Sequence, residues 1–306
     1  MLMRSKLRVS TLRDIKSTFG RFAAILAIIA LGVGFFSGVR ITTPAMVRTL
    51  GGFMEDHELF DYRIVSTLGW EESDVETLRE RKDVRAAEGA YALDIMFKDD
   101  YGNAPVMKVH SLTEKVNVPE ILEGRLPEND SECVMDGKTS YKLGDVLYVN
   151  PENEEDTLEK FKPREVTVVG LIYSPAYVHF ERGTTSLGNG TINGFIYMNK
   201  GAFDMEAYSE LYIKLDHELE VYSDEYNDYM AEREDSWEKA AEDAAEDRYD
   251  SIVSDAEDEL ADGRKKLEDA REEGQQKLDD ARSELDDAKT ELDKAAKKRS
   301  RTTRRS

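Results

Sequence analysis

An apolar run at residues 22–39 constrains the fold more than any other feature, because none of its 18 residues is charged. At about 1.5 Å per residue, a helix of this length extends about 27 Å, close to the roughly 30 Å hydrocarbon core of a bilayer. A helix also satisfies its own backbone hydrogen bonds, which lipid requires. Residues 41–43 extend the run slightly. The sequence therefore predicts a transmembrane helix at 22–43.

The charges around this helix predict its orientation. Only Arg40 and Arg48 follow it closely, whereas six basic residues and one acid precede it: Arg4, Lys6, Arg8, Arg13, Lys16, Arg21 and Asp14. The positive-inside rule then places the basic segment 1–21 in the cytoplasm and the bulk of the chain outside the cell membrane. A cleaved signal peptide is the alternative. The run is longer than the usual apolar core of about 7–15 residues and no clear cleavage site follows, which favours a single-pass, uncleaved anchor.

Small residues recur every four positions within this run, at Ala30, Gly34 and Gly38. Residues at this spacing share one helix face, where small side chains let another transmembrane helix approach closely. We interpret them as a packing face for other transmembrane helices. The alternative is that they reflect only the abundance of Gly and Ala in membrane helices.

Composition excludes several classes of protein. The formal net charge is -22, so the chain repels nucleic-acid phosphates and no nucleic-acid partner is expected. Cys133 is the single cysteine, which rules out an intramolecular disulfide and a zinc site built from several cysteines.

Short apolar runs separated by turn residues occupy the segment 44–217. A helix is predicted at 71–81, and strands are predicted at 62–66, 90–97, 105–110, 132–135, 146–149, 166–173, 194–198 and 211–215. A strand, a helix and then many short strands indicate an α+β domain, with mixed strands and helices, rather than a doubly wound parallel sheet.

No catalytic constellation is recognisable in this segment. The four histidines, His57, His110, His179 and His217, form neither an HExxH motif nor a close pair, and they are interpreted as surface or capping residues. Cys133 is expected to be a buried, small apolar group. The glycine-rich run 183–194 lacks the Lys-Ser/Thr of a phosphate-binding loop. We therefore expect no enzyme, no cofactor and no metal.

Several pieces of the chain resemble FtsX-like ABC transporter permeases that carry a MacB-like extracytoplasmic core domain. Residues 14–22 and 30–38 are similar to the first transmembrane helix of that family. The MacB-like pieces are 123–129 (EGRLPEN), 132–135 (ECVM), 143–145 (LGD) and 166–175 (VTVVGLIYSP). Their order and spacing cover roughly residues 10–216, so 44–217 is interpreted as the MacB-like domain.

The resemblance implies a binding and coupling module that works with a separate cytoplasmic ATP-binding subunit. It also implies at least three further transmembrane helices after this domain, and the sequence contains none. We therefore expect a permease-type subunit, or an N-terminal fragment from a truncated gene, acting in export or envelope signalling.

A long acidic helix is predicted at 218–296, where turn residues become rare and Ala, Glu, Lys and Leu dominate. Its apolar and small residues recur at spacings of three and four, which is typical of a coiled-coil seam. The leucines of this seam are Leu260, Leu267, Leu278, Leu285 and Leu292. Because Ala and Gly alternate with Leu, the seam buries little area alone and indicates a partner helix. A lone helix stabilised by charge pairs is the alternative.

The last ten residues, 297–306, are strongly basic and are expected to be disordered. They represent either a truncated or frameshifted end or a tail that contacts membrane lipid or anionic wall polymer. Two functional hypotheses remain open. The first is the permease-type subunit; the alternative is a stand-alone membrane-anchored coiled-coil adaptor for an envelope enzyme or scaffold. An extracytoplasmic hydrolase is a third class, but no nucleophile and base support it.

Overall fold

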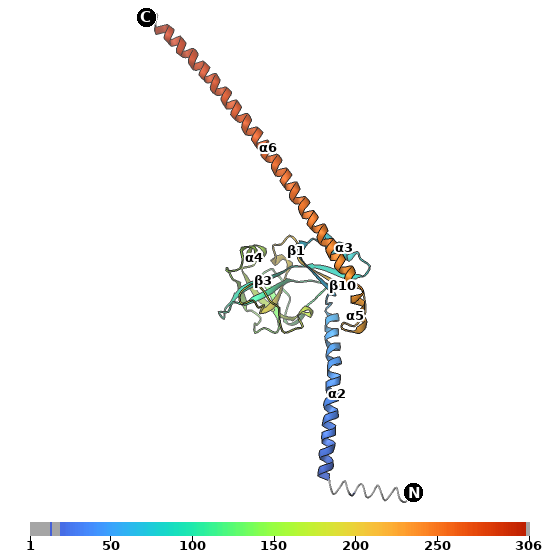
Figure 1. Ribbon diagram of the computed structural model, residues 1–306. Helices are drawn as coiled ribbons and strands as arrows, with labels where there is room; N and C mark the ends of the chain where they lie inside the picture. Colours follow the sequence, from blue (N-terminus) through green and yellow to red (C-terminus); the bar gives the residue numbers. More distant parts are fainter. Residues whose placement is uncertain (1–12, 14–18, 304–306) are drawn as a thin grey trace. The chain divides into compact units, whose positions relative to one another are not determined.

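The computed structural model describes residue 13 and residues 19–303, with side chains described as far as residue 295 (Figure 1). The chain divides into two units, Met1–Ala241 and Glu242–Ser306. Most of the predicted cytoplasmic segment 1–21, and the end of the basic tail, lie outside the described residues.

The helix α2, Phe19–Asp56, contains the apolar run and is 38 residues long. Among the residues that the structure describes, one helix is long and apolar enough to cross a membrane, and this helix is α2. Its apolar side chains are exposed, as lipid-facing residues are; Phe35, for example, is 77% exposed. The helix continues well past Thr43, the predicted end of the span, although Pro44 lies inside it. The transmembrane prediction therefore covers only the first part of a longer helix.

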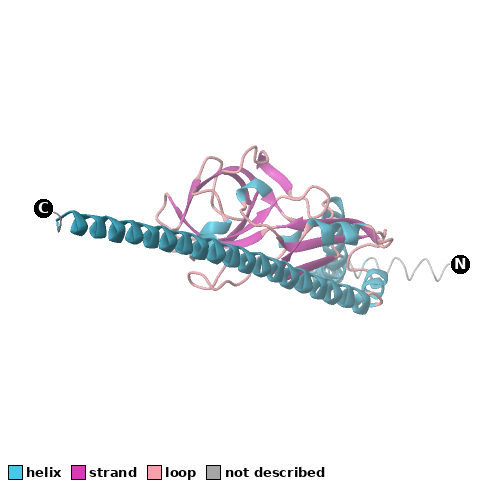
Figure 2. Ribbon diagram, turned by 90° about the horizontal axis from the view of Figure 1, so that it is seen from above, coloured by secondary structure: helices cyan, strands magenta, loops and turns pink. Residues whose placement is uncertain are grey.

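The strands at the centre of the first unit, drawn in magenta in Figure 2, are paired so that six of them form a closed ring. A seven-stranded sheet has the order β5 (Glu120–Gly124), β8 (Glu165–Tyr173), β6 (Glu132–Asp136), β9 (Gly194–Met198), β4 (Val106–Ser111), β3 (Ala92–Asp99) and β7 (Val146–Val149). Because β7 pairs with β8 as well as with β3, six of these strands close into a barrel and β5 lies outside the ring. The pairs β4–β9 and β6–β8 are parallel, so the sheet is mixed.

Alternate residues of the barrel strands form the main core. Ile95 and Phe97 of β3, and Val166 and Val168 of β8, are fully buried. Successive side chains of a strand point to opposite faces, so residues two apart share one face. Cys133 belongs to this core, as predicted, and burial raises the pKa of its thiol.

A second, three-stranded antiparallel sheet contains β1 (Tyr62–Trp70), β10 (Tyr208–Leu215) and β2 (Val84–Ala90). The helix α3, Glu72–Arg79, buries Val75 and Leu78, and a capping box between Glu71 and Asp74 fixes its first turn. The remaining short helices are α4 (Glu155–Lys160), η1 (Pro175–Tyr177), η2 (Lys200–Ala202) and α5 (Asp224–Ala231).

The α+β prediction is confirmed, and each strand named from the sequence exists within a few residues of its predicted position. The strands β2 and β5 and the helix α4 were not predicted. The sequence of β2, VRAAEGA, has Ala, Gly and charged residues, which are poor strand formers in isolation. Its pairing with β10 forms the strand, so tertiary contact decides its structure.

Gly124 shows why the Glu-Gly-Arg-Leu-Pro segment needs glycine. Its φ is +82°, and an added Cβ would lie 2.2 Å from the carbonyl oxygen of Val169. The substitution Gly124→Ala is therefore expected to lower the free energy of unfolding by about 1–3 kcal/mol, since it adds backbone strain and a clash between β5 and β8. Chemical denaturation measures this change. Gly102→Ala is the matched control for φ strain alone, because Gly102 has φ +85° and open space around it.

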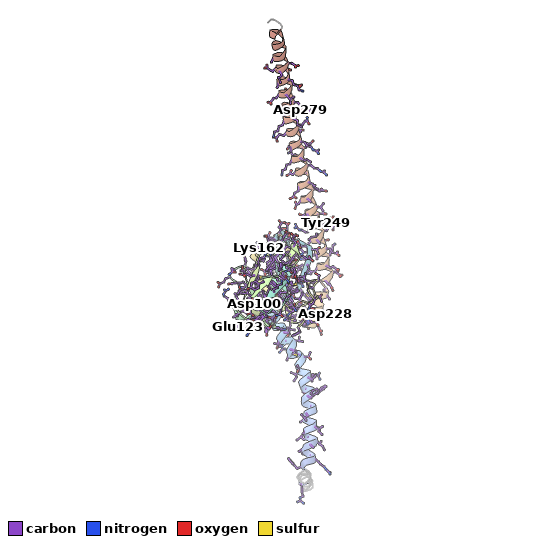
Figure 3. All side chains as sticks on the ribbon, turned by 90° about the vertical axis from the view of Figure 1, so that its left-hand side faces the viewer. Asp100, Glu123, Lys162, Asp228, Tyr249 and Asp279 are labelled. Atoms are coloured by element: carbon purple, nitrogen blue, oxygen red, sulfur yellow. The ribbon has the colours of Figure 1, made fainter. Side chains whose placement is uncertain are left out.

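The helix α6, Glu234–Thr303, is 70 residues long and includes most of the predicted acidic helix. The predicted single helix at 218–296 is interrupted, because α5 ends at Ala231 before α6 begins. The helix also continues through residues 297–303, most of the segment expected to be disordered. Figure 3 shows its side chains, with Tyr249 and Asp279 labelled, radiating from one rod. The seam leucines are 56–71% exposed, so the coiled coil stays a prediction.

Candidate functional site

The C-terminal end of α2 is closed by a Schellman motif. The amide of Leu59 donates to the carbonyl of Met54 at 2.8 Å, and the amide of Glu58 donates to that of Glu55 at 3.0 Å. Glu58 has the positive φ, 50°, that this motif requires. Met54 and Gly51 are buried, so the last turns of the helix pack on the domain. The end of the apolar helix is thus defined by both hydrogen bonds and packing.

The loop 114–118 holds this helix end. The amide of Asn117 donates to the carbonyl of Glu58 at 2.7 Å, and the amide of Val118 donates to that of His57 at 3.0 Å. Glu58 also forms an ion pair with Arg85 on β2. The two residues directly after the helix, His57 and Glu58, are therefore bonded to the domain through their backbone carbonyls.

The carboxylate of Glu88 on β2 fixes the same loop. It is 9% exposed and accepts hydrogen bonds from three consecutive backbone amides, those of Glu114, Lys115 and Val116, at 2.8–3.2 Å. A buried carboxylate that accepts several amide bonds is well satisfied. The loop that holds α2 is therefore attached to the three-stranded sheet.

Asn117 also connects the helix end to the barrel. Its side-chain amide donates to the hydroxyl of Tyr197 on β9 at 3.1 Å, and that hydroxyl lies 2.9 Å from the Ser174 hydroxyl. The ring of Tyr197 stacks on His110 of β4 with centroids 5.2 Å apart. The Nε2 of His110 lies 2.6 Å from the Tyr177 hydroxyl. A chain of buried polar contacts thus links the end of α2 to three parts of the barrel.

An ion pair between the partly exposed Arg63 and the buried Glu210 extends the polar cluster into the three-stranded sheet. Arg63 on β1 donates to both carboxylate oxygens of Glu210 on β10, at 3.0 and 2.5 Å, and Tyr212 donates to the same carboxylate at 2.7 Å. Burial by itself raises the pKa of Glu210, but the Arg63 hydrogen bond opposes it and the pKa is lowered overall. Glu210 is therefore held as a carboxylate.

His110 makes the cluster sensitive to acid, because burial lowers its pKa from 6.5 to about 4. The unfolded chain binds a proton at His110 at higher pH than the folded chain does. The contribution of neutral His110 to the free energy of unfolding is therefore fully present above about pH 6.5. It decreases by about 3 kcal/mol as the pH falls from there to 4. His110→Gln is expected to reduce the loss of unfolding free energy between pH 7 and pH 4.5 by about 2–3 kcal/mol.

Denaturant titrations at the two pH values measure this change. The control is His179→Gln, because His179 is exposed; this variant should keep the wild-type pH dependence. An unchanged pH dependence in His110→Gln would contradict the assignment.

A second buried cluster surrounds Asp61 at the start of β1. Its Oδ1 accepts from the Tyr226 hydroxyl of α5 at 2.9 Å and lies 3.2 Å from Nε2 of His217 and 3.5 Å from Nζ of Lys214. Its Oδ2 accepts from the amide of Leu215 at 2.8 Å. The side chain of Asp61 is 1% exposed. This carboxylate therefore joins β1, the end of β10 and α5.

The first turns of α6 contact the three-stranded sheet through Trp237, which is 3% exposed. Its ring stacks on Tyr62 of β1 with centroids 5.2 Å apart, and the Arg81 guanidinium lies 4.2 Å from its ring centroid. The C-terminal end of α2 and the start of α6 thus attach to the same sheet, through residues of the first unit.

A cavity of about 320 Å³ lies beside the end of α2. Leu50 and Phe53 of α2 line it together with Tyr177 of η1, Arg182 of the following loop and Phe195 of β9. Arg182 and Asp136 form a buried ion pair there, with Nε 2.6 Å from Oδ2 and side chains 5% and 3% exposed.

The interpretation of the histidines as surface residues was wrong for two of them. His110 is a buried member of the first polar cluster, and His217 has a side chain only 6% exposed, so neither is a surface group; the Nδ1 of His217 does accept from the amide of Leu219 at 3.2 Å, as a capping group would. In the described part of the chain no three His, Cys, Asp or Glu side chains gather as metal ligands would. The sequence alone does not show which distant residues come into contact. His110 and Tyr177 are 67 residues apart and Asp61 and Tyr226 are 165 apart, and only the fold brings each pair within hydrogen-bond distance.

The predicted packing face Ala30, Gly34 and Gly38 lies on the exposed surface of α2. A Cβ added at Gly34 or Gly38 would meet no atom within 4 Å. The face has room for another helix, and its role stays a prediction.

Comparisons with known proteins found matches among solved structures. No protein-family model matches the chain, and no curated protein matches it. One match is the extracellular domain of the noncanonic ABC-type transporter YknZ from Gram-positive bacteria, with TM-score 0.33 and 13% identity over 50% of this chain and 76% of that one.

Two other solved structures match with similar TM-scores, identities and coverage. The periplasmic region of MacB from Actinobacillus actinomycetemcomitans has TM-score 0.30 and 12% identity over 54% of this chain and 72% of that one. A domain of a putative permease protein from Porphyromonas gingivalis has TM-score 0.32 and 11% identity, over 52% of this chain and 74% of that one. The chain is thus similar, over about half of its length, to an extracellular domain of an ABC-type transporter, the periplasmic region of MacB and a domain of a permease protein.

Proposed function

We propose that the chain is a permease-type membrane subunit, or the N-terminal part of one, in an ABC transporter-like complex. In this role α2 crosses the membrane with its N-terminus in the cytoplasm, and the domain that follows lies outside. A separate cytoplasmic ATP-binding subunit would move α2, and the domain would follow that motion during export or envelope signalling. No catalytic step is assigned to the chain itself.

The attachment of α2 to the domain is the observation that carries this proposal. The helix ends in a Schellman motif, and the carbonyls of His57 and Glu58, the two residues directly after it, accept hydrogen bonds from Val118 and Asn117 of the domain. A flexible tether needs no such connection, because a long unstructured linker is enough to hold a domain at a membrane. A helix whose end is bonded to the domain transmits tilt and translation to it.

Affinity capture from native membranes tests the proposal. The tagged full chain is expected to recover an ATP-binding subunit, and the triple variant Ala30→Leu, Gly34→Leu and Gly38→Leu is expected to recover much less, because larger side chains block close helix approach. The matched control changes the other side of α2, with Ile28→Leu, Phe35→Leu and Val39→Leu, and should retain recovery. Clean capture of the wild-type chain without any ATP-binding subunit would contradict the proposal.

The alternative, a membrane-anchored coiled-coil adaptor, is favoured by one observation, the exposed seam leucines of α6. It expects capture of an envelope enzyme or scaffold that depends on α6 and not on Ala30, Gly34 and Gly38. Leu267→Ala combined with Leu285→Ala separates the two hypotheses, since only an adaptor should lose its captured partner entirely.

A further inference from the structure

The cavity beside the end of α2 has mostly apolar walls. Its apolar side chains and aromatic rings are those of Leu50, Phe53, Tyr173, Tyr177, Val178 and Phe195. Its volume of about 320 Å³ falls within the range of small-molecule sites, about 300–1,000 Å³. Because α2 supplies part of the wall, a molecule bound in this cavity contacts both α2 and the barrel.

The buried charged groups in this wall already have partners. The carboxylate of Asp136 accepts two hydrogen bonds from Arg182 and one from the amide of Lys138 at 3.0 Å. The remaining terminal nitrogen of Arg182 donates to the carbonyls of Tyr177 and His179. Two buried ions that satisfy each other in this way leave no free charge for a ligand inside the cavity.

The buried hydroxyl groups in the wall also have partners. The Tyr177 hydroxyl lies 2.6 Å from Nε2 of His110, and the Ser174 hydroxyl lies 2.9 Å from that of Tyr197. A polar group of a ligand would lose its hydrogen bonds to water inside the cavity and would find these groups occupied. The interior is therefore suited to a hydrocarbon group.

The exposed part of the lining has a different character. Lys138 and Tyr173 are exposed and Glu120 is half-buried, and all three line the cavity. Among the residues that the structure describes, neither Glu120 nor Lys138 forms an ion pair. One carboxylate and one ammonium group give this rim no net charge, so it accepts a polar group without selecting the sign of its charge. A ligand with an apolar chain and a polar end fits both parts of the cavity.

An apolar stripe of α2 connects the predicted membrane span to the cavity. Its residues follow one another at spacings of seven, four and three, which place them on one face of the helix. They are Val39, Met46, Leu50 and Phe53. The two arginines nearby, Arg40 and Arg48, lie at other angles around the helix, because successive residues are about 100° apart. The stripe therefore carries no charge between the span and the cavity.

The cavity also lies close to the predicted membrane surface. Leu50 is two helical turns beyond Thr43, the predicted end of the span, which is about 10 Å along α2. The polar headgroups of a bilayer extend about 5–7 Å beyond its hydrocarbon core on each side. A hydrocarbon chain that follows the apolar stripe is thus exposed to water over only a few Å before it enters the cavity, which keeps the hydrophobic cost of the transfer small.

We propose that this cavity holds the hydrocarbon chain of a membrane amphiphile, with the polar end of that molecule at Glu120, Lys138 and Tyr173. The chain leaves the outer leaflet along the apolar stripe and, once bound, lies between α2 and the barrel. The inference rests on the proposed function only for the position of the domain at the outer membrane surface. Capture of an ATP-binding subunit does not involve the cavity, so the two proposals fail separately.

Photolabelling of the full chain in phosphatidylcholine nanodiscs tests this proposal. Three diazirine probes are compared: a dodecanoic acid, a lysophosphatidylcholine with the same dodecanoyl chain, and a butyric acid. The readout is the label on the peptide that contains Phe195. The two long-chain probes should label this peptide within about threefold of each other, and the butyric acid at least about tenfold less, because recognition comes from the buried chain.

Two variants place a charge in the apolar interior, one in each wall. Leu50→Glu and Val178→Glu should each reduce long-chain labelling at Phe195 by about tenfold or more. Thr49→Glu and His179→Glu are their matched controls, since these exposed neighbours do not line the cavity, and labelling should stay within about twofold. The two walls are independent, so a folding defect in one variant leaves the other as the test.

Three outcomes would overturn the proposal. Equal labelling by the butyric acid probe would identify a site for a small soluble anion. Long-chain label confined to residues 22–47 would show that the chain stays in the bilayer. Equal losses in the cavity variants and in their neighbouring controls would show that the label at Phe195 does not report on the cavity.

Discussion

Asp61→Ala is expected to lower the free energy of unfolding of the domain by about 3–5 kcal/mol, because it leaves a buried cation without its partner. Asp61 and Lys214 are 1% and 4% exposed, and His217 beside them is 6% exposed. Removing the carboxylate also removes the acceptor of the Tyr226 hydroxyl and of the Leu215 amide. The start of β1, the end of β10 and α5 would lose their common contact.

Chemical denaturation of the purified chain measures the effect. Two further variants separate the contribution of the buried charge from that of an exposed charge and from that of the hydrogen bonds. Asp216→Ala removes the same charge from an exposed neighbour and should change stability by less than about 0.5 kcal/mol. Asp61→Asn keeps hydrogen-bonding capacity but loses the charge, so an intermediate loss is expected. A loss no larger in Asp61→Ala than in Asp216→Ala would show that Asp61 does not hold these elements together.

Asp136→Ala, in the barrel beside α2, is expected to lower the free energy of unfolding by a similar amount, about 3–5 kcal/mol. Its carboxylate receives two hydrogen bonds from Arg182, at 2.6 and 3.0 Å, and the two side chains are 3% and 5% exposed. The guanidinium would remain buried against Phe195, with its charge no longer neutralised.

A double-mutant cycle separates the charge from the packing. Asp136→Ala combined with Arg182→Met should be less destabilising than Asp136→Ala alone, since replacing a whole buried ion pair by apolar groups is often nearly neutral. The exposed pair Lys160–Asp156 is the control, and Asp156→Ala should cost about 0.5 kcal/mol or less. If the double variant is as unstable as the sum of the two single variants, the pair has no coupling and the assignment fails.

Local patterns in the sequence were enough to identify most elements of the fold. The uncharged run predicted the apolar helix, alternation and turn residues predicted most strands, and the spacing of leucines predicted the long acidic helix. These signals are local, because a helix or a strand face repeats over a few residues. Element ends were less accurate. The helix α2 extends to Asp56, beyond the polar residues that limited the prediction to Thr43.

The candidate site was not predictable in the same way. Its contacts join residues distant in sequence, such as Asn117 with Tyr197, and Asp61 with Tyr226. No periodicity connects such residues, since only chain folding brings them within hydrogen-bond distance. His110 illustrates the consequence: its identity was noted from the sequence, but its burial and lowered pKa arise from the barrel around it.

The sequence by itself determined that this chain has one long apolar helix, an α+β domain and an acidic helix with a leucine seam, because hydrophobic periodicity and charge are local properties. Only the tertiary structure decided that β7 pairs with both β3 and β8 to close a barrel, and that the end of α2 is bonded to the loop 114–118. Both features depend on backbone groups: every residue type has a carbonyl acceptor, and every type except proline has an N–H donor. The sequence carries little record of which backbone partner each group will find.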